Sequence, residues 1–241
     1  MQPTLKVRHL GVVEYPAARQ IQEEHRDRIL RAEEGAALFL LQHPPTVTLG
    51  SVTDSSDLLV SEEQFGLQGV ELFRTNRGGK ATYHGPGQLV GYPVIDLGKL
   101  AGPFISTGAG RASHGETSER VSPTAGPSVH EYLRGLEECL IILLRRVGLV
   151  GVRHAGETGV WIQDRKIASI GVAVRRWVTT HGFALNVDMD LNAFRTIRPC
   201  GFDPSIMTCI QSEGGTVPPW IDLERTAASE FARLFGFKIV E

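Results

Sequence analysis

Several short runs of apolar and β-branched residues follow one another between residues 150 and 190, with almost no chain between them. They lie around Val152 and at residues 159–163, 167–178 and 182–187. Such runs predict strands, and connections this short leave no room for a crossover helix. The pair Asp164–Arg165 supplies a turn between two of the runs, which indicates a hairpin. We therefore expect neighbouring strands that pair antiparallel.

The rest of the chain adds more strands and a few helices. Further strands are predicted at residues 5–11, 37–42, 46–49, 70–74 and 88–95, and helices at residues 15–34, from Ser61 onward, at 128–147 and at 223–235. In the helix at 128–147, apolar residues recur at three- and four-residue spacing, and Gly148 follows its end. Clustered strands with helices on few connections predict the α+β class, with helices packed on a mixed, largely antiparallel sheet.

Length and composition place the chain among globular proteins. With 241 residues it is long enough for one sizeable core, so residues 1–241 are expected to form a single domain. The 25 Lys and Arg against 27 Asp and Glu give no support to binding of nucleic acid or a membrane surface. The longest apolar run, residues 36–41, is far too short to span a bilayer. Three cysteines without a CxxC pair, and no apolar leader, favour a cytoplasmic location.

Residues 99–126 differ in composition from the chain on either side. Gly, Ser, Thr, Ala and Pro dominate, and the apolar periodicity disappears. A patternless stretch of this length is unusual for an ordinary connection between elements. We interpret it as a flexible surface insertion within one domain, because strand-rich sequence that would complete the same sheet follows it.

The segment from Arg77 to Gln88 has the most unusual composition in the chain. It carries four glycines, one proline and the triplet Thr82–Tyr83–His84 between two predicted strands. Glycine lets the backbone approach a ligand closely, and arginine, tyrosine and histidine present hydrogen-bond donors. The segment matches neither a phosphate-binding P-loop nor a dinucleotide fingerprint. From composition alone it is equally well explained as a Gly-rich hairpin loop with its turn at Pro86–Gly87.

The order of residues in this segment resembles one known family. Residues 77 to 92 follow Arg-Gly-Gly-x-x-Thr-Tyr-His-x-x-Gly-Gln-x-x-x-Tyr, the signature of the lipoate-pathway octanoyltransferases. Later segments resemble the family in the same order: Gly159-Val-Trp, Lys166-Ile-Ala-Ser-Ile-Gly, Arg176-Trp-Val, His181-Gly-Phe-Ala-Leu-Asn-Val and Pro199-Cys-Gly. The resemblance spans roughly residues 5 to 210 and implies a biotin/lipoate protein ligase-like (class II synthetase-like) fold. It also implies the activity of an octanoyl-acyl-carrier-protein–protein N-octanoyltransferase, an acyltransferase that needs no cofactor.

The resemblance places the nucleophile on Cys200 and its partner on Lys166. The sequence around Cys200 lies off any apolar helical face, which suits a reactive thiol. A lone cysteine is otherwise most often an inert small hydrophobic residue, which is how we interpret Cys139 and Cys209. Lys166, taken alone, is an ordinary solvated charge at a hairpin turn. A thiol is mostly protonated at neutral pH, however, so an ammonium that favours the thiolate or an amine that takes its proton would activate it.

The remaining family positions are implied to hold the acyl chain and its thioester carbonyl. They are Arg77, Gly78, Gly79, Lys80, Ala81, Thr82, Tyr83, His84, Ser169, Ile170, Gly171, Gly182, Phe183 and Ala184. Small residues and backbone donors suit a narrow apolar tunnel, although Ile170 and Phe183 would otherwise be assigned to the core. The eight histidines show no spacing typical of a metal site, so no metal is expected.

The implied reaction has two protein partners. The resemblance implies octanoyl-acyl-carrier protein as the donor, and lipoyl domains of 2-oxoacid dehydrogenase E2 subunits and of the glycine cleavage H protein as acceptors. Because these partners are acidic in the family, we consider Arg175, Arg176, Arg195 and Arg198 as a docking patch. Two alternatives stay open: an ATP-dependent lipoate or biotin ligase of the same fold, which needs no nucleophilic cysteine, and a binding module without activity.

Overall fold

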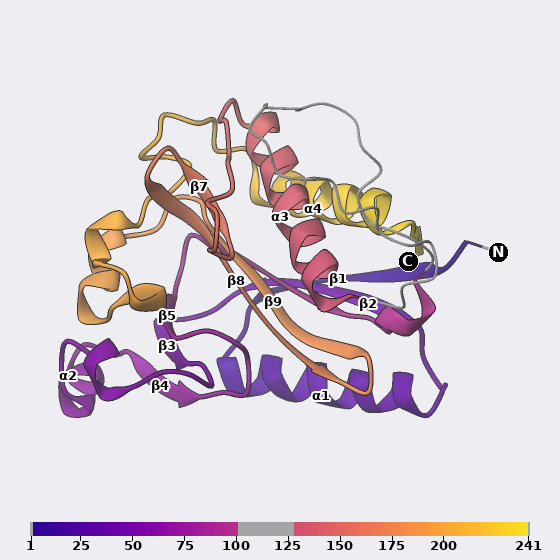
Figure 1. Ribbon diagram of the computed structural model, residues 1–241, viewed down its shortest axis with the longest axis horizontal. Coiled ribbons are helices and arrows are strands. Elements are labelled where there is room, and N and C mark those ends of the chain that lie inside the picture. Colours follow the sequence, from indigo (N-terminus) through magenta and orange to yellow (C-terminus); the bar gives the residue numbers. More distant parts are fainter. Residues whose placement is uncertain (1, 101–127, 241) are drawn as a thin grey trace.

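The computed structural model describes residues 2–100 and 128–240. A mixed seven-stranded sheet carries helices on both faces, and a three-stranded sheet lies at one end of it (Figure 1). The large sheet has the order β10-β1-β2-β6-β9-β8-β7. Its strands are β1 (Thr4–Val12), β2 (Ala36–Gln42), β6 (Gln88–Val94), β7 (Val160–Ile162), β8 (Arg165–Arg175), β9 (Val178–Asn186) and β10 (Lys238–Val240). Pairs β10–β1 and β1–β2 are parallel and the others antiparallel, so the predicted α+β class with a mixed, largely antiparallel sheet is confirmed.

The small sheet has the order β4-β3-β5, formed by β4 (Glu71–Arg74), β3 (Thr46–Leu49) and β5 (Ala81–His84). Helix α2 (Glu62–Leu67) packs against β4 and follows Ser61, where a helix was predicted to begin; Ser61 is its N-cap and forms a capping box with Gln64. Strand β5 lies inside the segment that composition alone explains as a Gly-rich loop. It forms a strand because it pairs antiparallel with β3, and the sequence near residues 81–84 does not predict this pairing.

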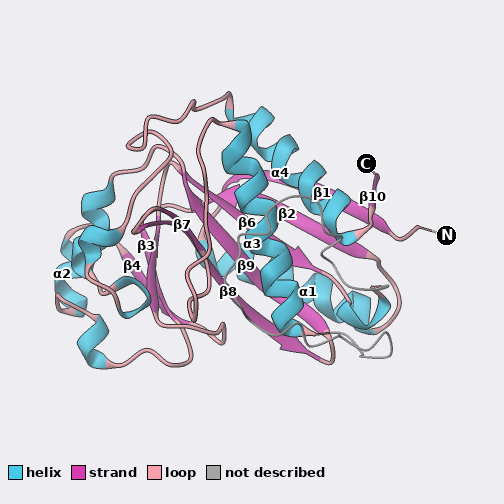
Figure 2. Ribbon diagram, turned by 45° about the horizontal axis from the view of Figure 1, so that its top comes forward, coloured by secondary structure: helices cyan, strands magenta, loops and turns pink. Residues whose placement is uncertain are grey.

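Three longer helices cover the large sheet. Figure 1 shows α3 (Val129–Arg146) and α4 (Trp220–Phe235) on one face and α1 (Tyr15–Leu30) on the other, and Figure 2 shows α3 lying across the strands. Strand β2 serves both faces by alternation: Leu38 and Leu40 pack in the core beneath α3 and α4, whereas Phe39 and Leu41 pack in the core beneath α1. The large sheet therefore has an apolar core on each of its two faces.

The hairpin of β8 and β9 differs from the prediction. The sequence predicts strands at 167–178 and 182–187, but the tip is formed by Arg176 and Trp177, which adopt left-handed φ values of 51° and 67°. Two-residue hairpin turns require such values and usually contain Asn or Gly, so this turn carries no sequence signal. The turn before β8 lies at residues 163–164, one residue earlier than predicted.

Other element ends follow their local signals more closely. Helix α4 ends at Phe235, as predicted, and begins at Trp220, three residues earlier than predicted; Gly236, left-handed with φ 73°, caps its end. Helix α1 ends at Leu30, four residues earlier than expected. The part of the chain that the structure describes also contains five short 3₁₀ turns: η1 (Ser55–Asp57), η2 (Leu97–Lys99), η3 (Leu191–Thr196), η4 (Pro199–Gly201) and η5 (Pro204–Ile206).

The insertion predicted at residues 99–126 lies outside the described residues from 101 onward. Within residues 2–100 and 128–240, no helix has the length and apolar character needed to cross a membrane.

Candidate active site

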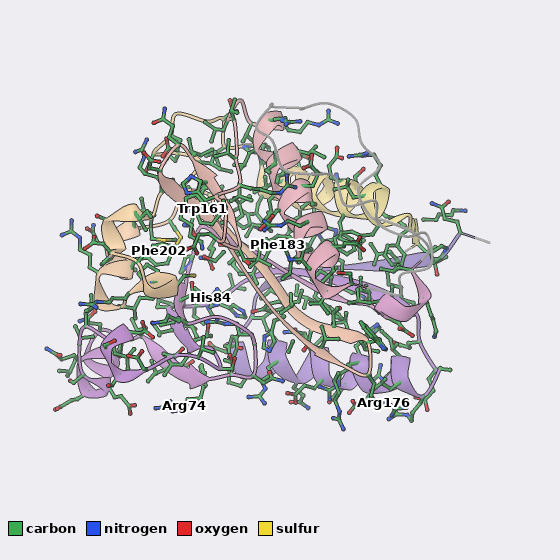
Figure 3. All side chains as sticks on the ribbon, in the orientation of Figure 1. Arg74, His84, Trp161, Arg176, Phe183 and Phe202 are labelled. Carbon is green, nitrogen blue, oxygen red and sulfur yellow. The ribbon has the colours of Figure 1, made fainter. Side chains whose placement is uncertain are left out.

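A pocket enclosing about 470 Å³, its open mouth included, lies where the small sheet meets β8 and β9 of the large sheet. Its walls come from segments far apart in the sequence. The lining residues are Tyr15, Arg77, Gly78, Gly79, Thr82, His84, Tyr92, Ser169, Ile170, Gly171, His181, Gly182, Phe183, Ala184 and Cys200. Figure 3 shows His84 and Phe183 near the middle of the molecule. All the predicted site residues line the pocket except Lys80, Ala81, Tyr83 and Lys166.

Strand geometry explains why part of the predicted binding segment faces elsewhere. Successive side chains of a strand point to opposite faces, so Thr82 and His84 on β5 face the pocket while Ala81 and Tyr83 face away. Ala81 and Tyr83 instead pack in the apolar core of the small sheet, where the Tyr83 ring meets Phe194 with centroids 5.7 Å apart. The side chains of Ala81 and Tyr83 therefore lie outside the pocket lining, and their part in substrate binding stays a prediction.

Lys80 also lies outside the pocket lining. Its ammonium is 3.1 Å from the buried carboxylate of Asp57, and its stem passes next to Gly201. The carbonyl of Asp57 in turn accepts a hydrogen bond of 2.8 Å from the backbone N–H of Arg198. Lys80 thus helps to hold the segment that carries Cys200, without lining the pocket.

Three pocket residues were not assigned a role from the sequence. Tyr92 and His181 stand inside the segments that resemble the octanoyltransferases, which is the signal that points to them. Tyr15, the first residue of α1, carries no such signal, because its position gives an ordinary amphipathic helix start. It enters the site through tertiary packing alone, with its ring stacked against Phe73 at 5.4 Å.

The backbone approaches itself closely at the pocket wall. Gly78 donates its N–H to the carbonyl of Val172 at 3.0 Å, so the segment after Arg77 crosses directly over β8. A Cβ atom on Gly171 would lie 3.0 Å from the carbonyl oxygen of Gly78, which only a glycine avoids. This approach places Arg77 against the end of the pocket formed by β8.

Arg77 supplies a buried positive charge in the pocket. Its side chain donates to the hydroxyl and carbonyl of Thr48, at 2.8 and 2.7 Å, and to the carbonyl of Gly78 at 3.1 Å. Among the described residues no carboxylate lies within ion-pair distance of it. Burial lowers the pKa of Arg77, and the negative charge of a Cys200 thiolate opposes that shift. A guanidinium remains charged under these conditions, so Arg77 acts electrostatically on Cys200.

The histidines around the pocket are uncharged at neutral pH. Burial lowers the pKa of His181 to about 3 and that of His43 to about 4, and places the pKa of His84 well below its usual value. His84 is held through Nδ1 by Gln88 at 2.8 Å, and His43 through Nε2 by the hydroxyl of Tyr92 at 2.8 Å. The rings of His84 and His181 are therefore neutral parts of the pocket wall, and the neutral ring of His43 lies next to His84, with centroids 5.5 Å apart.

Cys200 is the partly exposed cysteine of the chain, whereas Cys139 and Cys209 are buried as predicted. It lies in the turn Pro199–Gly201 and adopts a left-handed conformation, with φ 54° and ψ 21°. Such a conformation is uncommon for a residue other than glycine and is often found at functional sites. Burial raises the pKa of Cys139 to about 12, which leaves that thiol unreactive.

Lys166 is buried rather than solvated. Its side chain is about 1% exposed, and Nζ donates to the carbonyl of Thr158 at 3.0 Å. The ammonium lies 4.5 Å from the ring centroid of Trp161 and 5.4 Å from that of Phe202, two residues beyond Cys200. In the described part of the chain it has no carboxylate within ion-pair distance. An amine in such surroundings is unusual for a structural lysine, which excludes the solvated alternative.

The four arginines considered as a docking patch do not form one surface. Arg175 and Arg176 lie at the tip of the β8–β9 hairpin, and Arg195 and Arg198 belong to η3 and the start of η4. Figure 1 shows the hairpin tip at the lower right and the turns of residues 190–206 at the far left, and Figure 3 shows Arg176 at the lower right. The prediction that these four arginines form one docking patch is therefore wrong.

The sequence matches one family over most of its length. The family described as lipoyl protein ligase A/B catalytic domain matches residues 14–106 and 119–232. An octanoyltransferase of Gloeobacter violaceus is 41% identical over 94% of this chain and 88% of its own. An octanoyltransferase of Geobacter metallireducens is 39% identical over 98% of this chain and 95% of its own.

Solved structures share the fold at much lower identity. A crystal structure of lipoate-protein ligase A bound with ATP has a TM-score of 0.67 and 16% identity, covering 100% of this chain and 90% of its own. A bipartite lipoate protein ligase from Thermoplasma acidophilum has a TM-score of 0.60 and 17% identity, covering 100% of this chain and 88% of its own. The expected lipoate-ligase fold is thereby confirmed. The chain belongs to the lipoyl protein ligase A/B catalytic domain family, and within it to the octanoyltransferases, which are acyltransferase enzymes.

Proposed function

We propose that residues 1–241 form one catalytic domain that takes an octanoyl group from octanoyl-acyl-carrier protein and transfers it to a lysine of a lipoyl domain. The acceptors are lipoyl domains of 2-oxoacid dehydrogenase E2 subunits and of the glycine cleavage H protein, and the reaction takes place in the cytoplasm. The observation that carries the proposal is the position of Cys200. It is a partly exposed thiol in a left-handed turn, lining a pocket whose buried cation is Arg77.

In the first half-reaction, the Cys200 thiolate attacks the carbonyl carbon of the donor thioester. The new carbon–sulfur bond forms, the bond to the carrier thiol breaks, and Lys166 gives the departing thiolate a proton. The product is an octanoyl thioester on Cys200. Arg77, fixed by three hydrogen bonds to Thr48, stabilises negative charge that develops near the thiol and the carbonyl oxygen.

In the second half-reaction, the amine of the acceptor lysine attacks the octanoyl thioester. An amide bond forms, the carbon–sulfur bond to Cys200 breaks, and neutral Lys166 accepts the proton that the attacking amine must lose. Neutral Lys166 donates one N–H to the carbonyl of Thr158, and the lone pair of its nitrogen takes the proton. Splitting the transfer into two displacements is covalent catalysis, with ping-pong kinetics.

The pocket composition supports an acyl chain as the group bound. Ile170, Phe183 and Ala184 provide apolar surface, and Gly171 and Gly182, paired across β8 and β9, provide room beside it. Pockets of this kind bind a ligand by apolar contact and orient it with a few polar groups. The polar groups here include Arg77 and the hydroxyl of Thr82, whose oxygen is buried and has no partner among the described residues.

The experiment is intact-protein mass spectrometry after incubation with octanoyl-acyl-carrier protein. We expect one octanoyl group, removable by neutral hydroxylamine, on the parent and on Cys139→Ala, and none on Cys200→Ala. Labelling of Cys200→Ala would contradict the assignment of the nucleophile. The ATP-dependent ligase alternative requires instead that free octanoic acid and ATP support transfer to a lipoyl domain and that Cys200→Ala remain active.

A further inference from the structure

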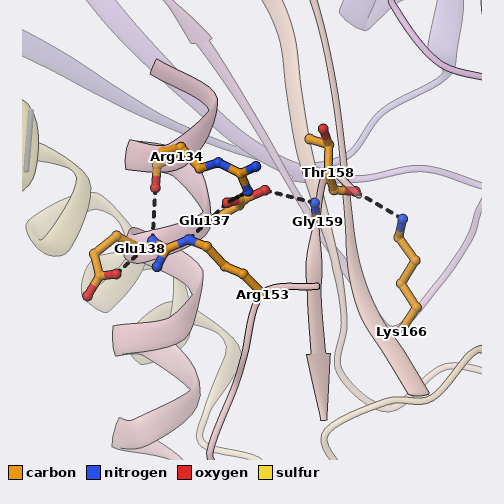
Figure 4. A network of polar contacts seen from close by, with 7 residues as sticks. All are labelled: Arg134, Glu137, Glu138, Arg153, Thr158, Gly159 and Lys166. Carbon is orange, nitrogen blue, oxygen red and sulfur yellow. Dashed lines mark hydrogen bonds and ion pairs between the residues drawn. The ribbon is translucent and has the colours of Figure 1, made fainter. Parts of the chain in front are cut away.

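A carboxylate with no exposed surface lies behind the candidate catalytic lysine. Glu137, on α3, is 0% exposed. Its carboxylate accepts hydrogen bonds from Arg134 at 2.7 Å and from Arg153 at 2.9 Å, as Figure 4 shows. Arg153 also donates to Glu138 at 2.7 Å, at the solvent side of the cluster. A buried carboxylate that accepts hydrogen bonds from two guanidinium groups is fixed in place.

The same carboxylate also binds the backbone on its far side. The N–H of Gly159 donates to Oε1 of Glu137 at 3.1 Å, and the carbonyl of Thr158 accepts from Nζ of Lys166 at 3.0 Å (Figure 4). That N–H and that carbonyl belong to one peptide group. In a trans peptide they point in opposite directions, so this single group links the Glu137 carboxylate to the Lys166 ammonium.

The linking peptide is closely confined. Gly159 has φ 133°, a conformation that L side chains rarely adopt. A Cβ atom there would lie 2.5 Å from the carbonyl oxygen of Ala168 and 3.0 Å from Cε of Lys166. The backbone therefore passes directly against the lysine stem, and a rotation of this peptide would carry the carbonyl away from Nζ.

The direction of the Lys166 N–H bonds depends on this carbonyl. The rings of Trp161 and Phe202 hold the ammonium by its charge but accept no directed hydrogen bond from it. Among the described residues, the Thr158 oxygen is the acceptor within hydrogen-bond distance of Nζ. A peptide held at its N–H by a carboxylate is also polarised, which strengthens the bond at its carbonyl.

We infer that Glu137 is a positioning residue for Lys166: it fixes the Thr158–Gly159 peptide, and through that peptide it aims the lysine N–H bonds. This rests on the proposed role of Lys166 in proton transfer. The inference predicts that the Cys200 acylation rate depends on the length of the Glu137 side chain rather than on its charge.

Two substitutions separate reach from charge. Glu137→Gln keeps the length of the side chain and an oxygen that accepts from Gly159, but loses the charge. Glu137→Asp keeps the charge for Arg134 and Arg153 but is one methylene too short to hold Gly159. The matched controls are Glu138→Gln and Glu138→Asp, since Glu138 binds the same Arg153 without touching the peptide.

The measurement is the single-turnover rate of Cys200 acylation at saturating octanoyl-acyl-carrier protein, with the donor KM measured beside it. Glu137→Asp should lower this rate by tenfold to about a hundredfold, as misplacing a reacting group does. The donor KM should stay within about twofold, because the pocket itself is unchanged. Glu137→Gln should stay within about threefold of the parent, and the Glu138 variants within about twofold, as lost rim contacts are small effects.

A double-mutant cycle shows whether the effect passes through the lysine. In a Lys166→Ala background, Glu137→Asp should cause no further loss of the Cys200 acylation rate, because there is no ammonium left to aim. A loss that persists there, a larger loss in Glu137→Gln than in Glu137→Asp, or no loss in either would overturn the inference. If Lys166→Ala alone acylates at the parental rate, the proposed role of Lys166 fails first. If Lys166→Ala is slow and Glu137→Asp is not, the positioning role alone is wrong.

Discussion

The uncharged histidines around the pocket make the stability of the protein depend on pH. Burial lowers the pKa of His43 to about 4 and that of His181 to about 3, whereas in an unfolded chain each is about 6.5. Below pH 6.5, His43 and His181 take up protons in the unfolded chain but stay neutral in the folded protein. The stabilisation is therefore complete above about pH 6.5 and is lost as the pH falls toward the folded values.

The size of the loss at pH 5.5 follows from the unfolded chain, because both folded pKa values lie lower still. One histidine with an unfolded pKa of 6.5 then costs RT ln(1 + 10), which is about 1.4 kcal/mol. His43 and His181 together predict a fall of about 3 kcal/mol in the free energy of unfolding between pH 7.5 and 5.5. His84, whose pKa is lowered in the same direction, adds to it.

Urea unfolding at the two pH values, followed by circular dichroism, measures this fall. In His181→Asn the decrease in the free energy of unfolding between pH 7.5 and 5.5 should be smaller by about 1.4 kcal/mol. A loss of stability that is equal at both pH values does not change this difference. Asparagine is the suitable replacement, because residue 181 has φ 58° and asparagine tolerates that conformation. His130→Asn, at an exposed position of α3, is the control and should keep the parental fall. An equal fall in His181→Asn and the parent would refute the reasoning.

Three further predictions concern the thiols, the pocket and the hairpin. At pH 8, iodoacetamide should modify Cys200 in the native protein and leave Cys139 unmodified, because burial raises the pKa of Cys139 to about 12. Peptide mapping checks this prediction, and early labelling of Cys139 would contradict it. A hexanoyl donor should acylate Cys200 about fifteenfold more slowly than an octanoyl donor at subsaturating concentration, since two buried methylenes contribute about 1.6 kcal/mol; equal rates would mean that the chain end is not enclosed. Arg176→Asn should raise the free energy of unfolding by about 0.5–1 kcal/mol, because residue 176 has φ 51° and asparagine adopts this conformation more readily than arginine. Arg175→Asn, within β8, should not raise the free energy of unfolding. Equal effects of the two substitutions would contradict the turn geometry.

Features that depend on neighbouring residues could be predicted from the sequence. The capping box at Ser61, the end of α4 at Gly236 and the strands β2, β3 and β6 all follow from short patterns. Features set by distant contacts could not. Strand β5 exists because β3 pairs with it, and β10 because it adds in parallel to β1 at the sheet edge. The hairpin tip was misplaced because Arg176 and Trp177 are not turn-forming residues.

The same distinction holds for the site. The resemblance of short segments to the octanoyltransferases located the pocket wall, but it treated residues 77–84 as one binding unit. The alternation of β5 divides them, so that Thr82 faces the pocket and Tyr83 faces a core. The burial of Lys166 could not be predicted either, since it depends on Trp161 and Phe202, which come from different segments.

The β8–β9 hairpin sets where this chain can change in length. Lys166 and the pocket residues Ser169–Gly171 share β8, and Gly182–Ala184 face them across the ladder in fixed register. Because side chains alternate along a strand, one residue inserted between Lys166 and Gly171 would send everything beyond it to the opposite face and separate the lysine from the pocket. Residues added at the tip, beyond Arg175, would leave that register untouched. Loop grafts, affinity tags and circular permutation are therefore best placed at the tip. The number of residues between positions 166 and 171 of β8 cannot change without moving Lys166 relative to the pocket.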